Sequence, residues 1–371
     1  METYRLNSKL VENDKEYVIQ TTNDISLGLV STEVYVDGIL TDSIKTPHPD
    51  RIKPEEVMSL VQNAHGEKKS EIESMLNSIK RTLDSTNPEA ILHLALAFYF
   101  KRFSDEARSL LKHVLTLDAG YHEAYNFLGQ VELSLGHVEA GVEAARTAVE
   151  LKPEYADYRN NLGEAFLAAK NYRNAVMEFE RAIDINLYYS DAYFNYGLTL
   201  LKNALEKQDT DLFANFVSKS YDYFSKSAII NPEYKSLNYE NGLSLLKEQN
   251  IPEAFELLKR VREYHKKIQR QKSAPYYMKH VLHPNWISEK AIADRISFLQ
   301  KEIDKNPTYV DLYAELSRCY LGQAQMIWKK GIDQYKKTIN LNPGYTKLKD
   351  YVAEAEITYE AINHVVKKIS D

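Results

Sequence analysis

Apolar residues along most of this chain recur at helical spacing, and the pattern itself repeats every 34 residues, as the tyrosines at 121, 155 and 189 show. Each repeat has a small residue at its eighth place: Ala95, Gly129, Gly163, Gly197 and Gly242. A second small residue follows further along each repeat: Ala107, Gly141, Ala175, Ser220 and Ala254. Antiparallel helices approach closely only where the side chains at their crossing are small. Each repeat is therefore predicted to be a hairpin of two helices.

The repeats divide most of the chain into consecutive units. Five of them are regular enough to share one phase: 88–121, 122–155, 156–189, 190–234 and 235–268. Two degenerate units follow at 269–309 and 310–345, and residues 273–286 are expected to form a loop or a broken helix. The fourth unit carries an insertion near Asn203–Asp211. Prolines are expected to end second helices, since proline cannot continue a helix: Pro153, Pro232, Pro307 and Pro343.

The first 45 residues follow a different, two-residue period that is typical of β-strands. Tight turns are indicated by Glu12-Asn13-Asp14, Asn23-Asp24 and Asp37-Gly38. This pattern predicts a meander of four antiparallel strands. So small a sheet buries too little apolar surface to be stable alone, and we expect it to pack on a helix or on a partner.

Helical segments flank the repeats on both sides. Pro54 begins a helical stretch that runs to about Leu83, with a break at Gly66 left open, and its apolar stripe is expected to cover the first repeat. A similar stripe near the C-terminus predicts a capping helix. The expected domains are a β-meander module at 1–50, connecting helices at 51–87, a solenoid at 88–345 and a capping helix at 346–371.

The unit at 122–155 resembles the tetratricopeptide repeat family. The resemblance rests on Tyr125, Leu128, Gly129, Gly141, Ala148 and Pro153. It implies a mainly α fold, an α-solenoid or superhelix, with the small antiparallel β module added at its N-terminus. It also implies a concave groove lined by the first helices, where family members hold peptides or extended segments. A non-catalytic scaffold for protein–protein interaction is the function that follows from this resemblance.

Nine residues are expected to face that groove: Asn126, Gln130, Asn160, Asn161, Glu164, Phe194, Asn195, Leu198 and Tyr239. A side-chain amide offers a donor and an acceptor together, so the asparagines can pair with the backbone of an extended peptide whatever its sequence. The alternative is that they hydrogen-bond within the array. The sequence leaves both interpretations open.

The second helix of the fifth unit and the residues after it are strongly basic. The cations are Lys259, Arg260, Arg262, Lys266, Lys267, Arg270 and Lys272, with tyrosines nearby. A basic, aromatic segment is compatible with binding RNA or an acidic partner. It supports a second hypothesis, a nucleic-acid- or ribosome-associated factor, while a solvated helix face is the simpler interpretation.

Composition narrows the remaining possibilities. The 371 residues carry a formal charge of −6, which argues weakly against a dedicated nucleic-acid binder. Cys319 is the single cysteine, so a disulfide framework and a thiolate metal cluster are excluded, and we expect it to be packed inside the array. We find no signal peptide at the N-terminus and no apolar run long enough to span a bilayer, so a cytoplasmic protein is expected.

Motifs for chemistry are missing from the sequence. It has no phosphate-binding glycine loop, no Gly-x-Ser-x-Gly and no His-Glu-x-x-His. His280 and His283 could share a helix face but have no third ligand nearby, so no metal and no cofactor are predicted. A divergent enzyme is the least favoured hypothesis.

Overall fold

The computed structural model describes residues 3–12, 14–24, 26–48, 53–83, 87–282, 289–305, 307, 310–342 and 347–370. By its internal contacts the chain forms two compact units, Met1–Pro284 and Asn285–Asp371. Among the residues named in the sequence analysis, Asn13, His283 and Pro343 lie outside the described residues.

The first unit begins with the predicted four-stranded antiparallel sheet, in the order β1-β2-β3-β4. Its strands are β1 (Arg5–Glu12), β2 (Lys15–Asp24), β3 (Leu29–Val36) and β4 (Ile39–Pro47). Asp37 and Gly38 both have positive φ, 49° and 80°, as a tight hairpin turn of this type requires. The strand alternation predicted from the sequence is confirmed.

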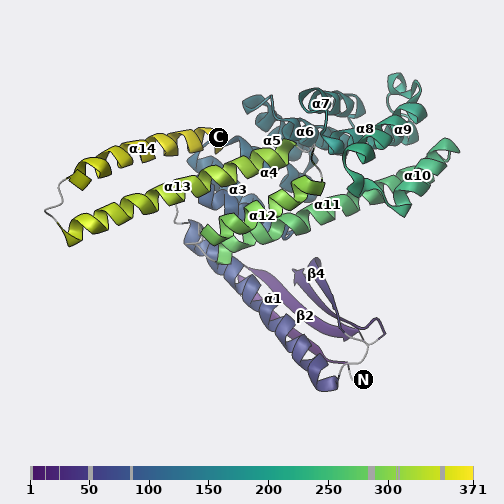
Figure 1. The fold of residues 1–371 in the computed structure, drawn as a ribbon. Helices are drawn as coiled ribbons and strands as arrows, with labels where there is room; N and C mark the ends of the chain where they lie inside the picture. Colours follow the sequence, from purple (N-terminus) through teal and green to yellow (C-terminus); the bar gives the residue numbers. More distant parts are fainter. Residues whose placement is uncertain are drawn as a thin grey trace. The chain divides into compact units, whose positions relative to one another are not determined.

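One face of the sheet is covered by α1 (Pro54–Leu83), a single helix of 30 residues with no break at Gly66 (Figure 1). Val57 and Val61 of α1 are buried, as are Ile19 and Val34 of the sheet. Further along, α1 packs on α2 (Pro88–Phe100), and its apolar residues join the same buried cluster as those of the first hairpin. The small sheet therefore obtains its core from a helix, as expected.

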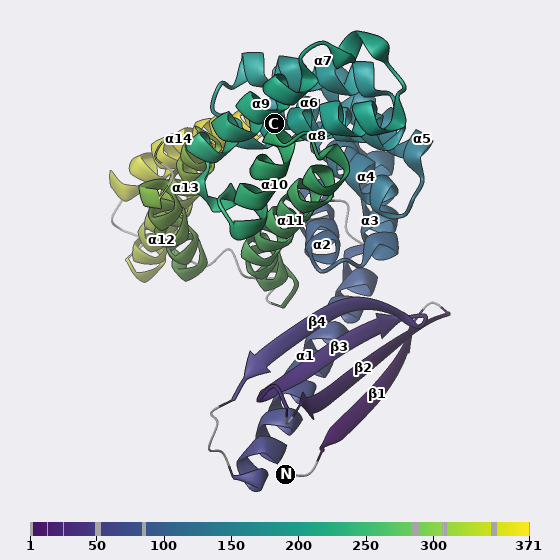
Figure 2. The same cartoon turned by 90° about the vertical axis from the view of Figure 1, so that its right-hand side faces the viewer.

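Five helical hairpins follow, and they confirm the repeat phase. They are α2–α3 (Pro88–Phe100, Ser104–Leu117), α4–α5 (His122–Ser134, Val138–Leu151), α6–α7 (Ala156–Ala168, Tyr172–Ile185), α8–α9 (Ser190–Glu206, Phe216–Ile230) and α10–α11 (Leu237–Lys247, Ile251–Leu282). Short 3-10 turns, η1 (Thr210–Phe213) and η2 (Pro232–Tyr234), lie before and after α9. Figure 2 shows the hairpins stacked side by side.

The phased glycines lie where the two helices of a hairpin touch. A Cβ on Gly163 would lie 2.6 Å from the ring of Phe179, and a Cβ on Gly197 would lie 2.8 Å from the ring of Phe224. Side chains are essentially never found that close, so these positions accept only glycine without a shift of the ring. The predicted reason for the small residues is therefore confirmed.

The chain departs from the predicted pattern after residue 268. We expected a loop or broken helix at 273–286, but α11 continues to Leu282 and contains Pro275. In place of a hairpin at 310–345 there is one helix of 32 residues, α13 (Val310–Leu341). A Cβ on Gly331 would meet nothing within 4 Å, so this glycine does not mark a helix crossing.

The second unit consists of α12 (Glu289–Lys305), α13 and α14 (Lys347–Ser370) in its described part. Both α12 and α14 pack on α13. Cys319 of α13 is half-buried, and burial raises the pKa of its thiol. The assignment of α14 as a cap for the array remains a prediction.

Candidate functional site

The predicted groove residues come from the first helices of consecutive hairpins. α4, α6 and α8 are neighbours, and they present Asn126, Asn160 and Asn195 on one side, which we call the first-helix face. These three amides are at most 3% exposed. Gln130, Asn161 and Glu164 are half-buried. The predicted alignment of the polar residues across the hairpins is present, but most of it is covered.

The asparagines of the first-helix face pair with one another. The Nδ2 of Asn161 donates to the Oδ1 of Asn126 at 2.8 Å, and the Nδ2 of Asn195 donates to the Oδ1 of Asn160 at 2.9 Å. Gln130 accepts a hydrogen bond from a tyrosine hydroxyl of α2 at 2.8 Å. In this structure the amides therefore bond within the array, which is the alternative left open by the sequence.

The predicted apolar positions belong to the core. Phe194 is fully buried and stacks on Tyr234 with ring centroids 4.4 Å apart. Leu198 and Tyr239 are each 6% exposed, and the Tyr239 hydroxyl donates to the backbone carbonyl of Phe224. These side chains fill the space between hairpins and leave no apolar pocket of their own on the face.

The first-helix face is covered by α11. The beginning of this helix packs on α10 to complete the fifth hairpin, and from Arg262 onward the helix lies against α8 and continues to α2 of the first hairpin (Figure 2). Near its end, Tyr277 stacks on Phe100 of α2 with centroids 5.1 Å apart, and Met278 is buried in the cluster of the first hairpin. Arg270 lies over the ring of Tyr99 at 5.5 Å. The basic segment predicted separately therefore lies against the predicted groove.

Arg262 of α11 is the centre of the contact. It is 6% exposed, and its Nε donates to the Oδ1 of Asn195 at 2.8 Å. Its two terminal nitrogens reach Glu164 at 2.9 Å and Asp191 at 3.0 Å. One helical turn further, Lys266 lies 2.6 Å from the second oxygen of Glu164. Both carboxylates are thus matched by cations of α11.

A second group of polar residues continues the contact along α11. The ring of His265 stacks on Tyr234 at 4.2 Å and lies 3.2 Å from the side-chain nitrogen of Asn231. Lys272 binds Glu233 at 2.7 Å. The sequence analysis did not identify Asp191, Tyr234 or His265. The available signal was a spacing of three and four residues, which places side chains on one face of a helix. It is shared by Arg262, His265, Lys266 and Gln269.

The contact shifts the acidity of its members. Burial acts to raise the pKa of Asp191, but the charges of Arg262 and His265 lower it to about 2. Burial likewise opposes ionisation of Glu164, and Lys266 and Arg262 outweigh it, so the pKa of that carboxyl also falls. Burial lowers the pKa of His265. Both carboxylates are therefore held ionised beside the cations of α11.

The predicted basic patch is divided by this arrangement. Four of its residues are buried or half-buried, and three are exposed: Arg262, Lys266, Arg270 and Lys272 are the covered ones, and Lys259, Arg260 and Lys267 are exposed. The seven cations therefore do not form one open surface, as a nucleic-acid site would require.

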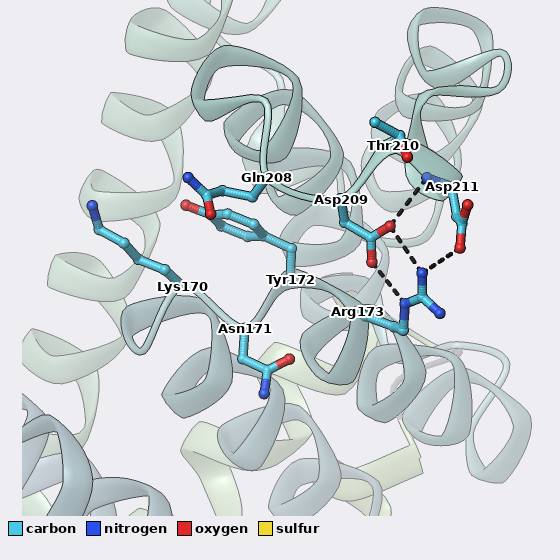
Figure 3. Close-up of a pocket in the computed structure, with 8 residues that line it drawn as sticks. All are labelled: Lys170, Asn171, Tyr172, Arg173, Gln208, Asp209, Thr210 and Asp211. Atoms are coloured by element: carbon cyan, nitrogen blue, oxygen red, sulfur yellow. Dashed lines mark hydrogen bonds and ion pairs between the residues drawn. The ribbon is translucent and has the colours of Figure 1, made fainter.

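The insertion in the fourth unit forms a shallow pocket with the turn between α6 and α7 (Figure 3). Arg173 donates to both oxygens of Asp209, at 2.7 and 3.0 Å, and also pairs with Asp211. The side-chain oxygen of Asn203 accepts from the backbone nitrogen of Asp209 at 2.9 Å. These contacts attach the insertion to α7.

Within the described residues, no group of three or more His, Cys, Asp and Glu side chains could hold a metal ion. None of the helices there is long and apolar enough to cross a membrane. The predicted histidine pair at 280 and 283 cannot be placed, because the side chain of His280 and the whole of His283 lie outside the described part.

Comparisons with known proteins agree with this architecture. Human tetratricopeptide repeat protein 13 is 22% identical over 125 residues, which are 34% of this chain and 14% of that protein. An uncharacterized protein of Haemophilus influenzae is 25% identical over 124 residues, 33% of this chain and 69% of that protein. The chain therefore spans only a small part of the human relative.

Among solved structures, PilF of Pseudomonas aeruginosa is 18% identical, with 72% of this chain and 97% of that one covered and a TM-score of 0.36. YrrB, described as a TPR protein with an unusual peptide-binding site, is 16% identical over 53% of this chain and 97% of that one, with a TM-score of 0.35. Residues 128–187 match the family model for the tetratricopeptide repeat. With this match inside five hairpins of constant phase, the chain contains tetratricopeptide repeats and carries an N-terminal four-stranded antiparallel sheet.

Proposed function

We propose that this protein is a non-catalytic scaffold that binds a partner protein on its first-helix face. The supporting observation is that this face already seats a protein segment, residues 262–282 of α11, through side chains from several hairpins. A surface that aligns amides and carboxylates from successive repeats offers contacts along the length of a bound segment.

The sequence analysis favoured an extended segment, because free asparagine amides suit a peptide backbone. In the structure these amides are paired with one another, and the segment held against the face is helical. We therefore propose a helical partner segment, a mode in which side chains on one face of the helix carry the recognition.

Site-specific photo-crosslinking tests this function. A photoreactive residue at Gln130, half-buried on the first-helix face, is compared with one at Met177, which is 41% exposed on α7. A partner protein that crosslinks at Gln130 and not at Met177 supports the proposal. Crosslinking at Met177 alone, or equally at both positions, would contradict it.

The nucleic-acid hypothesis has less support. Arg262, one of the seven cations of the basic patch, is buried against two carboxylates. Of the seven, those exposed are Lys259, Arg260 and Lys267. Binding of RNA through phosphate contacts would weaken steeply with salt. A steep salt dependence, abolished by replacing these three exposed cations with alanine, would restore this hypothesis.

A further inference from the structure

The contact between α11 and the first-helix face is polar in its middle and apolar at its ends. Phe255, Leu258 and Val261 are buried in the core of the fifth hairpin, and Met278 is buried in that of the first. Between them, the buried side chains of α11 are Arg262, His265 and, near the end, Ala274. The middle of α11 is therefore held mainly by groups that water can also solvate.

The charges across this contact are arranged by sign. The repeats contribute the carboxylates Glu164 and Asp191, and η2 contributes Glu233. α11 contributes the cations that match them, Arg262, Lys266 and Lys272. Without α11, three carboxylates would lose these cations, and a surface of one sign attracts a segment of the other.

We propose that the first-helix face selects a helix with cations spaced as in α11, and that residues 262–282 of α11 occupy this face as a competing internal segment. Arg262 and Lys266 lie one helical turn apart, so a partner helix needs two cations at this spacing on one face to replace them. The inference rests on the proposed function, because it names the chemistry of the partner that the same face would bind.

Pro275 marks the place where the internal segment is weakest along its backbone. A proline inside a helix removes one backbone hydrogen bond and crowds the preceding turn. It separates the polar middle of α11 from the apolar end that carries Tyr277 and Met278. Release of the end can therefore occur as a separate step from release of the middle.

The test uses a synthetic peptide with the sequence of residues 259–282 and the full-length chain. A peptide that competes with an internal copy binds with an affinity reduced by the fraction of open chains. The double variant Arg262→Ala, Lys266→Ala should open the face and bind the peptide at least about tenfold more tightly than the unmodified chain. The same two replacements made in the peptide should abolish that gain.

A matched variant removes the same charge from the other side of the helix. Arg260 and Lys267 are exposed on α11, so Arg260→Ala, Lys267→Ala should leave the affinity for the peptide within about twofold of the unmodified chain. The inference would be overturned if all three chains bound the peptide with equal affinity, or if replacing the cations of the peptide left its affinity unchanged. In either case α11 would be a fixed structural helix.

Hydrogen exchange of the unmodified chain gives a second test that needs no variant. The amides of 262–282 should exchange through an opening of lower free energy than those of α6 and α8. Identical opening free energies would overturn the inference. The peptide has the sequence of this chain itself and is not a partner protein. If it binds as expected but no partner protein crosslinks at Gln130, only the proposed function is contradicted.

Discussion

Asp191 makes the contact of α11 sensitive to acid. The hydroxyl of Tyr234 donates to its carboxylate at 2.7 Å, and a nitrogen of Arg262 lies 3.0 Å away. Burial opposes its ionisation, yet Arg262 and His265 lower its pKa from 3.8 to about 2. A carboxyl with a lower pKa in the folded state adds stability above its unfolded pKa, and this is lost as the pH falls through the folded value. The contact should therefore weaken from about pH 4 to about pH 2.

The size of this effect follows from the pKa difference. From 3.8 to about 2 is slightly less than two pKa units, and each unit corresponds to about 1.4 kcal/mol, so Asp191 contributes about 2 kcal/mol. Glu164 adds to the loss, because its pKa is also lowered. His265 acts in the same direction: burial lowers its pKa, so its neutral form is favoured, and stability declines as the pH falls below 6.5.

The variant Asp191→Asn isolates the first of these contributions, because asparagine keeps the shape and cannot titrate. Native-state hydrogen exchange of residues 262–272, corrected for the intrinsic effect of pH on exchange, gives the opening free energy of the polar middle. The unmodified chain should exceed the variant by about 2 kcal/mol at pH 6 and converge with it near pH 2. Parallel curves over this range would refute the reasoning.

Three further changes test the fold that supports the face. Gly163→Ala and Gly66→Ala both gain helix preference, but only the new methyl at 163 meets a neighbouring ring, that of Phe179. In urea unfolding, the Gly163→Ala variant should therefore be less stable than the Gly66→Ala variant by about 1–3 kcal/mol. Equal changes in the free energy of unfolding would contradict the close crossing at Gly163. Lys68→Ala removes a 4% exposed cation from between two carboxylates and should cost about 2 kcal/mol or more; a change below about 0.5 kcal/mol would contradict its role. Deletion of residues 1–84 should uncover the apolar first hairpin and cause association in sedimentation velocity, and a monomer of unchanged stability would show that α1 does not protect it.

The hairpins could be predicted because their cause is local in the sequence. A glycine such as Gly163 is required by a partner only 16 places away, Phe179, and the same relation returns between Gly242 and Leu258. The end of the array could not be predicted in the same way. Pro275 suggested a break, but a helix interior tolerates a proline where the rest of the helix is held by packing, and α11 is held at both of its ends.

The candidate site brings together the asparagines of the first helices and the basic segment, which are far apart in the sequence. The amide pattern and the basic segment were each visible, but Arg262 meets Glu164 across 98 positions of the chain. Residue types reveal which groups can donate and accept, whereas the partner of each group depends on where a later helix returns. The direction in which α11 leaves the fifth hairpin is set by tertiary packing, and no periodic signal records it.

The polar character of this contact is informative because apolar residues would have held α11 more simply. Buried ion pairs add little net stability, since the cost of removing both charges from water offsets much of their attraction. Arg262 and Lys266 lie where leucine or methionine would suffice to fix a permanent strut, and the facing residues Asn160 and Asn195 are equally polar. Such pairs determine which partner binds and in which register it binds. They also leave a face that is compatible with water when its occupant leaves. These are the properties that an exchangeable helix needs and a structural one does not.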